Sequence, residues 1–152
     1  MDYPGLYLIH LPSAGMKLEN TFRALNKLVR DGKIKYIGIS NTNLKLLKES
    51  RNFSETPVIT NQVPCSLSDR SNIKNGMVEY CQLNNIFPTA CSPIDEGRLR
   101  SNKILETLAK THDVITYQIA LAWVFSQSLV ITIPMSAKPK HIKENLGRQI
   151  LN

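Results

Sequence analysis

Short polar side chains follow five apolar runs of this 152-residue chain, at positions where they could hydrogen-bond a ligand or a reacting group. The apolar runs with their polar ends are residues 6–10, 36–41, 58–62, 87–92 and 130–136. In a parallel α/β barrel the body of each strand is buried, and its carboxyl end opens into the active site. The histidine, serine, asparagine and glutamine side chains at these ends therefore predict where the chemistry takes place.

Helical patterns separate most of these runs. Leu18, Phe22, Leu25 and Leu28 share one helical face, and a glycine at position 32 suits the end of that helix. Further helices are expected to begin near Asn43, Ser71, Ser101, Thr116 and Lys138. Strands that alternate with helices predict an α/β fold with parallel strands and right-handed crossovers. An open doubly wound sheet is the alternative, but its glycine-rich turn does not follow the first run.

Composition indicates one globular domain over residues 1–152, with 42% hydrophobic and 20% charged residues. No apolar run is long enough to span a membrane, and the first residues lack a signal-peptide pattern. We therefore expect a cytoplasmic protein with no membrane partner. Cys65, Cys81 and Cys91 match no zinc or redox spacing, so we expect reduced thiols and no metal.

The formal net charge of +7 does not by itself indicate a nucleic-acid partner. A protein that binds DNA or RNA gathers its basic residues in a run or on one face. Here they are scattered, as Arg23, Lys27 and Arg30 illustrate. We expect no nucleic-acid binding, and some attraction for a phosphorylated small molecule.

Six motifs in the chain resemble those of the aldo-keto reductase family. LYLIHLP at residues 6–12 resembles the family's LYLIHWP, and GKIKYIGISNTN at residues 32–43 is similar to GKI-x-x-IGVSNFN. TNQV at residues 60–63 and TACSP at residues 89–93 resemble VNQV and AYSP. YQIALAWV at residues 117–124 looks like the helix before the eighth strand, and IPMSAKPKHIKEN at residues 133–145 resembles the C-terminal signature. The motifs follow the family's order and rough spacing.

This resemblance implies a (β/α)8 TIM-barrel type of fold, of which the chain would be a partial barrel comprising roughly the last five β/α units. It implies an oxidoreductase that transfers a hydride from a nicotinamide cofactor to a small aldehyde or ketone. The expected cofactor is NADP(H), with NAD(H) as the alternative. The cofactor would lie extended across the carboxyl ends of the strands.

The resemblance also assigns roles to individual residues. His10 takes the position of the catalytic histidine that orients the carbonyl. Ser40, Asn41 and Gln62 take positions that hold the nicotinamide carboxamide, for which short polar side chains at strand ends are suitable.

Further positions correspond to the rest of the cofactor. Cys91 stands where the family has the tyrosine that stacks on the nicotinamide, and Ser92 where it contacts the pyrophosphate. An inert small side chain at position 91 is favoured over a reactive thiol. The positions around the adenosine end are Ser136, His141, Glu144 and Asn145. The helix that begins near Pro139 favours a phosphate there.

Several positions depart from the family pattern. Met135 replaces a basic residue that usually meets the 2′-phosphate of NADPH, and His141 replaces a common arginine; Lys138 or Lys140 could compensate. Thr42 and Leu11 replace aromatic residues. Asp95 and Glu96 could act as acid and base, but a polar or cofactor-closing loop is favoured.

No residue matches the family's catalytic tyrosine, lysine and aspartate, which precede its fourth strand, where this chain begins. We therefore expect a truncated barrel. Its exposed strand edges would favour self-association or a complementary chain. The alternative function is that of a non-catalytic remnant, or of one half of a two-chain barrel, that binds nucleotide or plays a structural role.

Overall fold

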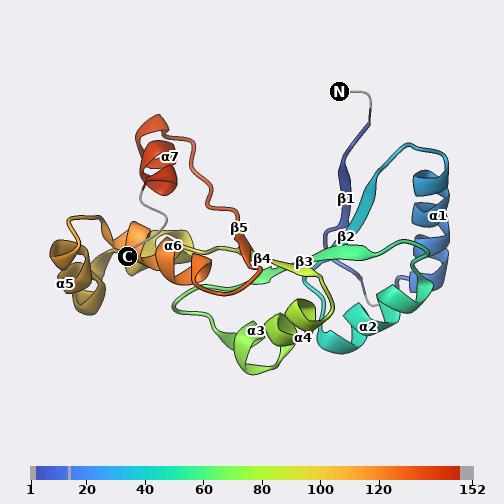
Figure 1. Ribbon diagram of the computed structural model, residues 1–152, viewed down its shortest axis with the longest axis horizontal. Coiled ribbons are helices and arrows are strands. Elements are labelled where there is room, and N and C mark those ends of the chain that lie inside the picture. The colour runs from blue at the N-terminus through green and yellow to red at the C-terminus, as the bar shows by residue number, and fades with distance from the viewer. Residues whose placement is uncertain (1–2, 14, 148–152) are drawn as a thin grey trace. The chain divides into compact units, whose positions relative to one another are not determined.

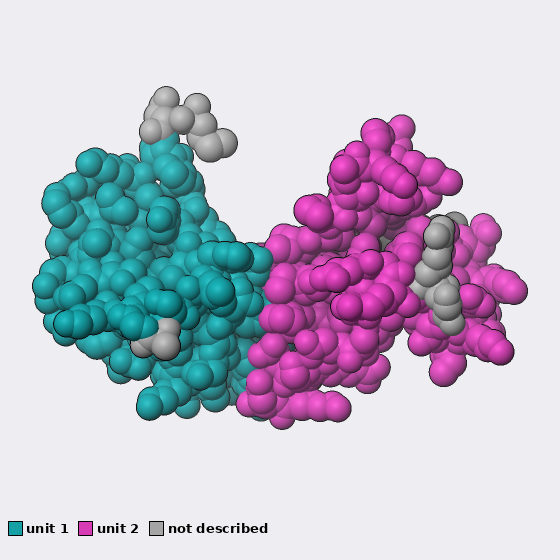
Figure 2. All heavy atoms as spheres, turned by 180° about the vertical axis from the view of Figure 1, so that it is seen from behind, with its two compact units in different colours: residues 1–63, 76–88 teal, residues 64–75, 89–152 magenta. Residues whose placement is uncertain are grey.

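The computed structural model describes residues 3–13 and 15–147, which form two compact units (Figure 1). Figure 2 shows the units in separate colours: residues 1–63 and 76–88 make unit 1, and residues 64–75 and 89–152 make unit 2. Each unit is described separately below.

The strands are hydrogen-bonded in chain order, β1-β2-β3-β4-β5. Their bounds are β1 Leu6–Ile9, β2 Tyr36–Ser40, β3 Val58–Pro64, β4 Phe87–Cys91 and β5 Ile131–Thr132. The pairs β1–β2, β2–β3 and β4–β5 are parallel, as the alternation of strands and helices predicts. In unit 1, Ile9 is opposite Ile39 and Ser40 is opposite Gln62, so the polar ends of these strands coincide.

Gly38 of β2 is required by the strands on either side. A Cβ atom at this position would lie 2.7 Å from a methyl carbon of Thr60 and 3.0 Å from one of Leu8. Glycine therefore allows the close approach of the side chains of β1 and β3.

Unit 1 buries its apolar face between these strands and three helices: α1 Leu18–Arg30, α2 Leu44–Phe53 and α4 Met77–Leu83. Helix α1 is amphipathic, and its Phe22 and Leu25 are buried. Their partners in the core include Ile37, Ile39 and Leu47. The Asn43 side chain accepts a hydrogen bond from the Leu46 N–H and caps α2, as predicted.

Unit 2 contains the other described helices. They are α3 Ser71–Lys74, the 3₁₀ helix η1 Asp95–Ser101, α5 Lys103–Thr111, α6 Thr116–Phe125 and α7 Pro139–Leu146. Helix α6 packs on α5, η1, β5 and α7. Its buried Ile119 and Ala120 join Leu99, Leu105 and Ala109 in the core of this unit. None of the described helices is long and apolar enough to cross a membrane.

Several expected boundaries are wrong. One helix is expected to begin near Ser71, but the structure has two there: α3 ends at Lys74, and α4 begins at Met77 after Gly76, whose φ of 80° places it in the left-handed region. Helix α5 is capped by Asn102 rather than Ser101, because the Asn102 side chain accepts from the N–H groups of Ile104 and Leu105. The last strand is shorter than its apolar run.

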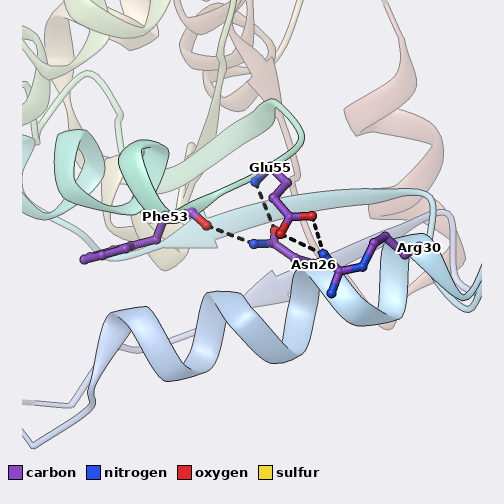
Figure 3. A network of polar contacts seen from close by, with 4 residues as sticks. All are labelled: Asn26, Arg30, Phe53 and Glu55. Atoms are coloured by element: carbon purple, nitrogen blue, oxygen red, sulfur yellow. Dashed lines mark hydrogen bonds and ion pairs between the residues drawn. The ribbon is translucent and has the colours of Figure 1, made fainter.

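A buried asparagine joins α1 to the segment between α2 and β3 (Figure 3). Asn26 Nδ2 donates to the Phe53 carbonyl at 2.9 Å, and Asn26 Oδ1 accepts from the Glu55 N–H at 3.1 Å. The Asn26 side chain therefore satisfies two backbone groups of this segment. The Glu55 carboxylate also accepts two hydrogen bonds from Arg30 Nη1, at 2.7 and 2.6 Å, on the protein surface.

We expect Asn26→Ala to lower the free energy of unfolding by about 1–3 kcal/mol, because it leaves two backbone groups without their partner. Arg30→Ala removes an exposed ion pair and should cost no more than about 1 kcal/mol. Urea denaturation of both variants measures the difference. An Asn26→Ala variant no less stable than Arg30→Ala would show that the buried amide does not hold the segment.

Candidate functional site

The four polar residues predicted at the ends of β1, β2 and β3 lie together in unit 1. We call His10, Ser40, Asn41 and Gln62 the strand-tip cluster. Asn41 Nδ2 donates to the His10 carbonyl and to Ser40 Oγ, both at 3.0 Å. Ser40 Oγ donates to the Gln62 carbonyl at 3.0 Å, and the Asn41 N–H donates to the same carbonyl at 2.8 Å. These bonds tie the ends of β1 and β2 to Gln62, which lies two residues before the end of β3, since that strand runs past its expected end to Pro64.

Asn41 adopts an unusual backbone conformation at the end of β2. Its φ is 55°, in the left-handed region that asparagine tolerates better than most residues. This conformation directs the chain from β2 towards α2, while the Asn41 side chain donates to the His10 carbonyl and the Asn41 backbone N–H donates to the Gln62 carbonyl. Asparagine is thus suited both to the turn and to the cluster.

A buried pair of polar side chains, Thr42 and Asn61, adjoins Asn41 and Gln62 of the cluster in sequence. Thr42 Oγ1 donates to Asn61 Oδ1 at 3.2 Å, and Asn61 Nδ2 lies 3.2 Å from Met77 Sδ. Asn61 is fully buried. The sequence motif contained Asn61, but nothing in its type or spacing distinguished a supporting residue from a ligand-binding one.

The strand-tip cluster leaves several groups available to a ligand. No hydrogen bond joins the Gln62 amide, the His10 imidazole or Asn41 Oδ1 to another residue that the structure describes. Ser40, in contrast, is 1% exposed and its hydroxyl is already bonded on both sides. A carboxamide needs one donor and one acceptor, and Gln62 and Asn41 can provide them. The described residues therefore fit a nicotinamide amide, with Ser40 as the group that positions Asn41.

Unit 2 contains a cavity of about 600 Å³, which we call the unit 2 cavity. Its walls include five of the residues predicted to contact a cofactor: Ser92, Ser136, His141, Glu144 and Asn145. They come from the end of β4, the segment after β5, and α7. The structure thus brings together residues that are far apart in the sequence: Ser92 and Asn145 are separated by 53 positions.

Helix α7 is held beside the unit 2 cavity by Gln118 of α6. Gln118 Nε2 donates to the carbonyls of Glu144 and Gly147, at 3.0 and 3.1 Å. Gln118 Oε1 accepts from the Ile115 N–H at 3.2 Å, which orients the amide. At the other end of α7, the Lys138 N–H donates to Ser136 Oγ. Gln118 was not expected to have this role, because its partners are more than 25 residues away in the sequence.

The segment after β4 forms another wall of the unit 2 cavity. Ser92, Asp95 and Glu96 all have φ near 50°, and Gly97 has φ 89°. Such backbone strain in non-glycine residues persists only where the surroundings hold it. One such restraint is the hydroxyl of Tyr117, which donates to the Gly97 carbonyl at 3.2 Å. Tyr117 and Gly97 line the cavity and were not predicted to do so.

Cys91 ends β4 and is partly exposed, but it is not among the described residues that line the unit 2 cavity. Burial raises the pKa of its thiol above the usual value. The pKa of the buried Cys81 is raised to about 11 for the same reason. At neutral pH both are protonated thiols, which are poor nucleophiles. This chemistry supports an inert small side chain at position 91.

Comparison with known proteins identifies the class to which this fold and these residues belong. The family model described as Aldo/keto reductase family matches residues 1–149. The chain belongs to the aldo/keto reductase family. Its fold is accordingly α/β with parallel strands, as the sequence predicts.

Relatives and solved structures give the same result. The chain is 38% identical over 145 residues to a glyoxal reductase of Bacillus subtilis (strain 168), covering 95% of this chain and 51% of the relative. It matches the thermostable aldo-keto reductase Tm1743, solved with the inhibitor epalrestat, with a TM-score of 0.92 and 39% identity, covering 95% of this chain and 54% of the other. An aldo/keto reductase from Klebsiella pneumoniae in complex with NADP and acetate matches with a TM-score of 0.88 and 28% identity, over 99% and 56% of the two chains.

The chain spans about half the length of the relatives that it matches. The matched part contains the strand-tip cluster and the unit 2 cavity. The roles of individual residues, from His10 to Asn145, stay predictions.

Proposed function

We propose that this chain provides the cofactor-binding part and one catalytic residue of an NAD(P)H-dependent reductase of small aldehydes and ketones. The observation that carries the proposal is the strand-tip cluster, in which strand ends are fixed by hydrogen bonds while the His10 imidazole and Gln62 amide remain available. The named activity of the glyoxal reductase relative suggests a small dicarbonyl such as glyoxal as the substrate.

In unit 1, Gln62 and Asn41 would hold the nicotinamide carboxamide. Gln62 Nε2 can donate to the carboxamide oxygen, and Asn41 Oδ1 can accept from its NH₂ group. The bound cofactor would supply the hydride. His10 would donate a hydrogen bond to the substrate carbonyl oxygen and so stabilise the negative charge that develops there.

In unit 2, the cavity would bind the adenosine portion of the cofactor. Ser136 and Asn145 offer uncharged hydrogen-bonding groups, and Ile133 and Pro93 offer apolar contact for an aromatic base. A complex of the Klebsiella pneumoniae relative with NADP supports a dinucleotide as the ligand of the family.

Carbonyl reduction is completed by a proton, and this proton requires a donor. No residue of this chain matches the catalytic tyrosine of the family, which would provide it. We propose that polypeptide outside these 152 residues supplies it, whether in the same chain or in a second one. Apolar residues on the terminal strands support a partner: Leu6 and Tyr7 of β1 are 38% and 47% exposed, and Ile131 of β5 is 46% exposed. Burial of such residues would stabilise the complete assembly. A cytoplasmic location and a single domain over residues 1–152 stay predictions.

Glyoxal reduction tests the proposed function. We expect loss of reduced nicotinamide cofactor in the presence of glyoxal when the proton donor is supplied, and a rate at least about 10²-fold lower with the chain alone. The proposal fails if the assembly oxidises cofactor no faster with glyoxal than without it.

A second function is favoured by the half-length match to relatives. In it the chain binds a nucleotide without catalysis. Cofactor binding that persists while no partner polypeptide restores turnover would establish this second function instead.

A further inference from the structure

The charge of the unit 2 cavity bears on which cofactor it accepts. Among the described residues that line it there is neither lysine nor arginine, and His141 is their only basic side chain. Two carboxylates, Glu96 and Glu144, are part of the lining. The cavity is therefore neutral to acidic, although the protein as a whole carries a formal charge of +7.

Each of these carboxylates has a cation within ion-pair distance, but neither cation belongs to the described cavity lining. Arg98 Nη2 lies 3.7 Å from Glu96, and Lys140 Nζ lies 3.8 Å from Glu144. The Arg98 and Lys140 side chains are 69% and 84% exposed, and neither residue is among those that line the cavity. At such exposure their charges are screened by water and salt, and so is that of Glu96, which is 71% exposed. Glu144 is only 28% exposed and is therefore the carboxylate with the stronger effect in the cavity.

The two nicotinamide cofactors differ at a single group, the 2′ position of the adenosine ribose. NADPH carries a phosphate there, with a charge between −1 and −2, whereas NADH carries a hydroxyl that can donate a hydrogen bond. A carboxylate accepts a hydrogen bond from this hydroxyl but repels the phosphate, and an arginine does the opposite. The described lining offers carboxylates.

Met135 lies in the cavity wall at a position where a lysine or arginine side chain would face a bound phosphate. It lines the unit 2 cavity, and its side chain is 88% exposed. A thioether provides neither charge nor a hydrogen-bond donor for a phosphate. Because the side chain is so exposed, a lysine at this position would not disturb the packing of the unit.

We propose that the unit 2 cavity does not select for the 2′-phosphate, so that this protein binds NADH at least as well as NADPH. The inference rests on the proposed function, since it assigns the adenosine portion of the cofactor to this cavity. It departs from the expectation of NADP(H) as the cofactor and makes NAD(H) an equal or preferred ligand.

Equilibrium titrations followed by nicotinamide fluorescence test this inference. For the unmodified protein we expect a Kd for NADH equal to or below that for NADPH. Met135→Lys should tighten NADPH binding about tenfold and leave NADH within about twofold, because the new ammonium group meets only the phosphate. Met135→Leu is the matched control and should change neither Kd.

The outcomes separate this inference from the proposed function. If the unmodified protein binds NADPH tenfold or more tightly than NADH, the inference is wrong and the proposed function stands. If Lys140→Ala weakens NADPH binding alone, a cation outside the cavity lining selects the phosphate, which also contradicts the inference. If neither cofactor binds, the proposed function fails, and the inference fails with it.

Discussion

Replacing His10 with alanine is expected to lower kcat/KM for glyoxal reduction by about 10²–10³-fold, the usual cost of removing a hydrogen bond to a developing oxyanion. The loss should fall mainly on kcat, because the His10 imidazole acts on the reacting carbonyl. The measurement uses whichever form of the protein turns over, the chain alone or its assembly with the polypeptide that supplies the proton donor.

The structure indicates that His10→Ala removes the imidazole without disturbing the hydrogen bonds of the strand-tip cluster. Asn41 bonds the backbone carbonyl of residue 10, at 3.0 Å, and an alanine retains that carbonyl. The strand-tip cluster should therefore keep its shape, and the cofactor Kd should stay within about twofold of its original value. His112→Ala, at an exposed position after α5, is the matched control and should retain full activity. A His10→Ala variant with unchanged kcat/KM would exclude His10 from the reaction.

Replacing Phe22 with alanine should have the largest effect on stability, lowering the free energy of unfolding by about 3–5 kcal/mol. Phe22 is 0% exposed and packs in the core of unit 1 with residues of β2 and α2. Removal of the phenyl ring leaves a cavity between the side chains of β2 and α2, and these side chains relax only partly to fill it. Phe22→Leu conserves much of the volume and should cost less than half as much.

Urea denaturation of the unmodified protein, Phe22→Ala and Phe22→Leu measures this effect. Leu83→Ala serves as the control, because Leu83 is 77% exposed on α4 of the same unit and should change stability by no more than about 0.5 kcal/mol. A Phe22→Ala variant as stable as Leu83→Ala would contradict the described core.

The sequence predicts those parts of the site that depend on local pattern. His10, Ser40, Asn41 and Gln62 directly follow or end apolar runs, and parallel pairing in register is sufficient to bring such positions together. The α/β class follows from the same alternation of strands and helices.

Other features depend on contacts between distant segments and could not be predicted. Tyr117 reaches Gly97 across 20 residues, and Gln118 reaches Gly147 across 29. The supporting role of Ser40 is similar, because only the structure shows that its hydroxyl is already bonded while the Gln62 amide is not. The break at Gly76 reflects a left-handed backbone conformation that helical spacing does not reveal.

Backbone amide NMR spectra recorded during addition of NADH test the central claim most directly. We expect the largest shifts at Ser40, Asn41 and Gln62 in unit 1, and at Ser136, His141 and Asn145 in unit 2. The amide of Leu83 should not move. Shifts confined to residues outside the strand-tip cluster and the unit 2 cavity, or no shifts at millimolar cofactor, would contradict the proposal that these residues bind a nicotinamide dinucleotide.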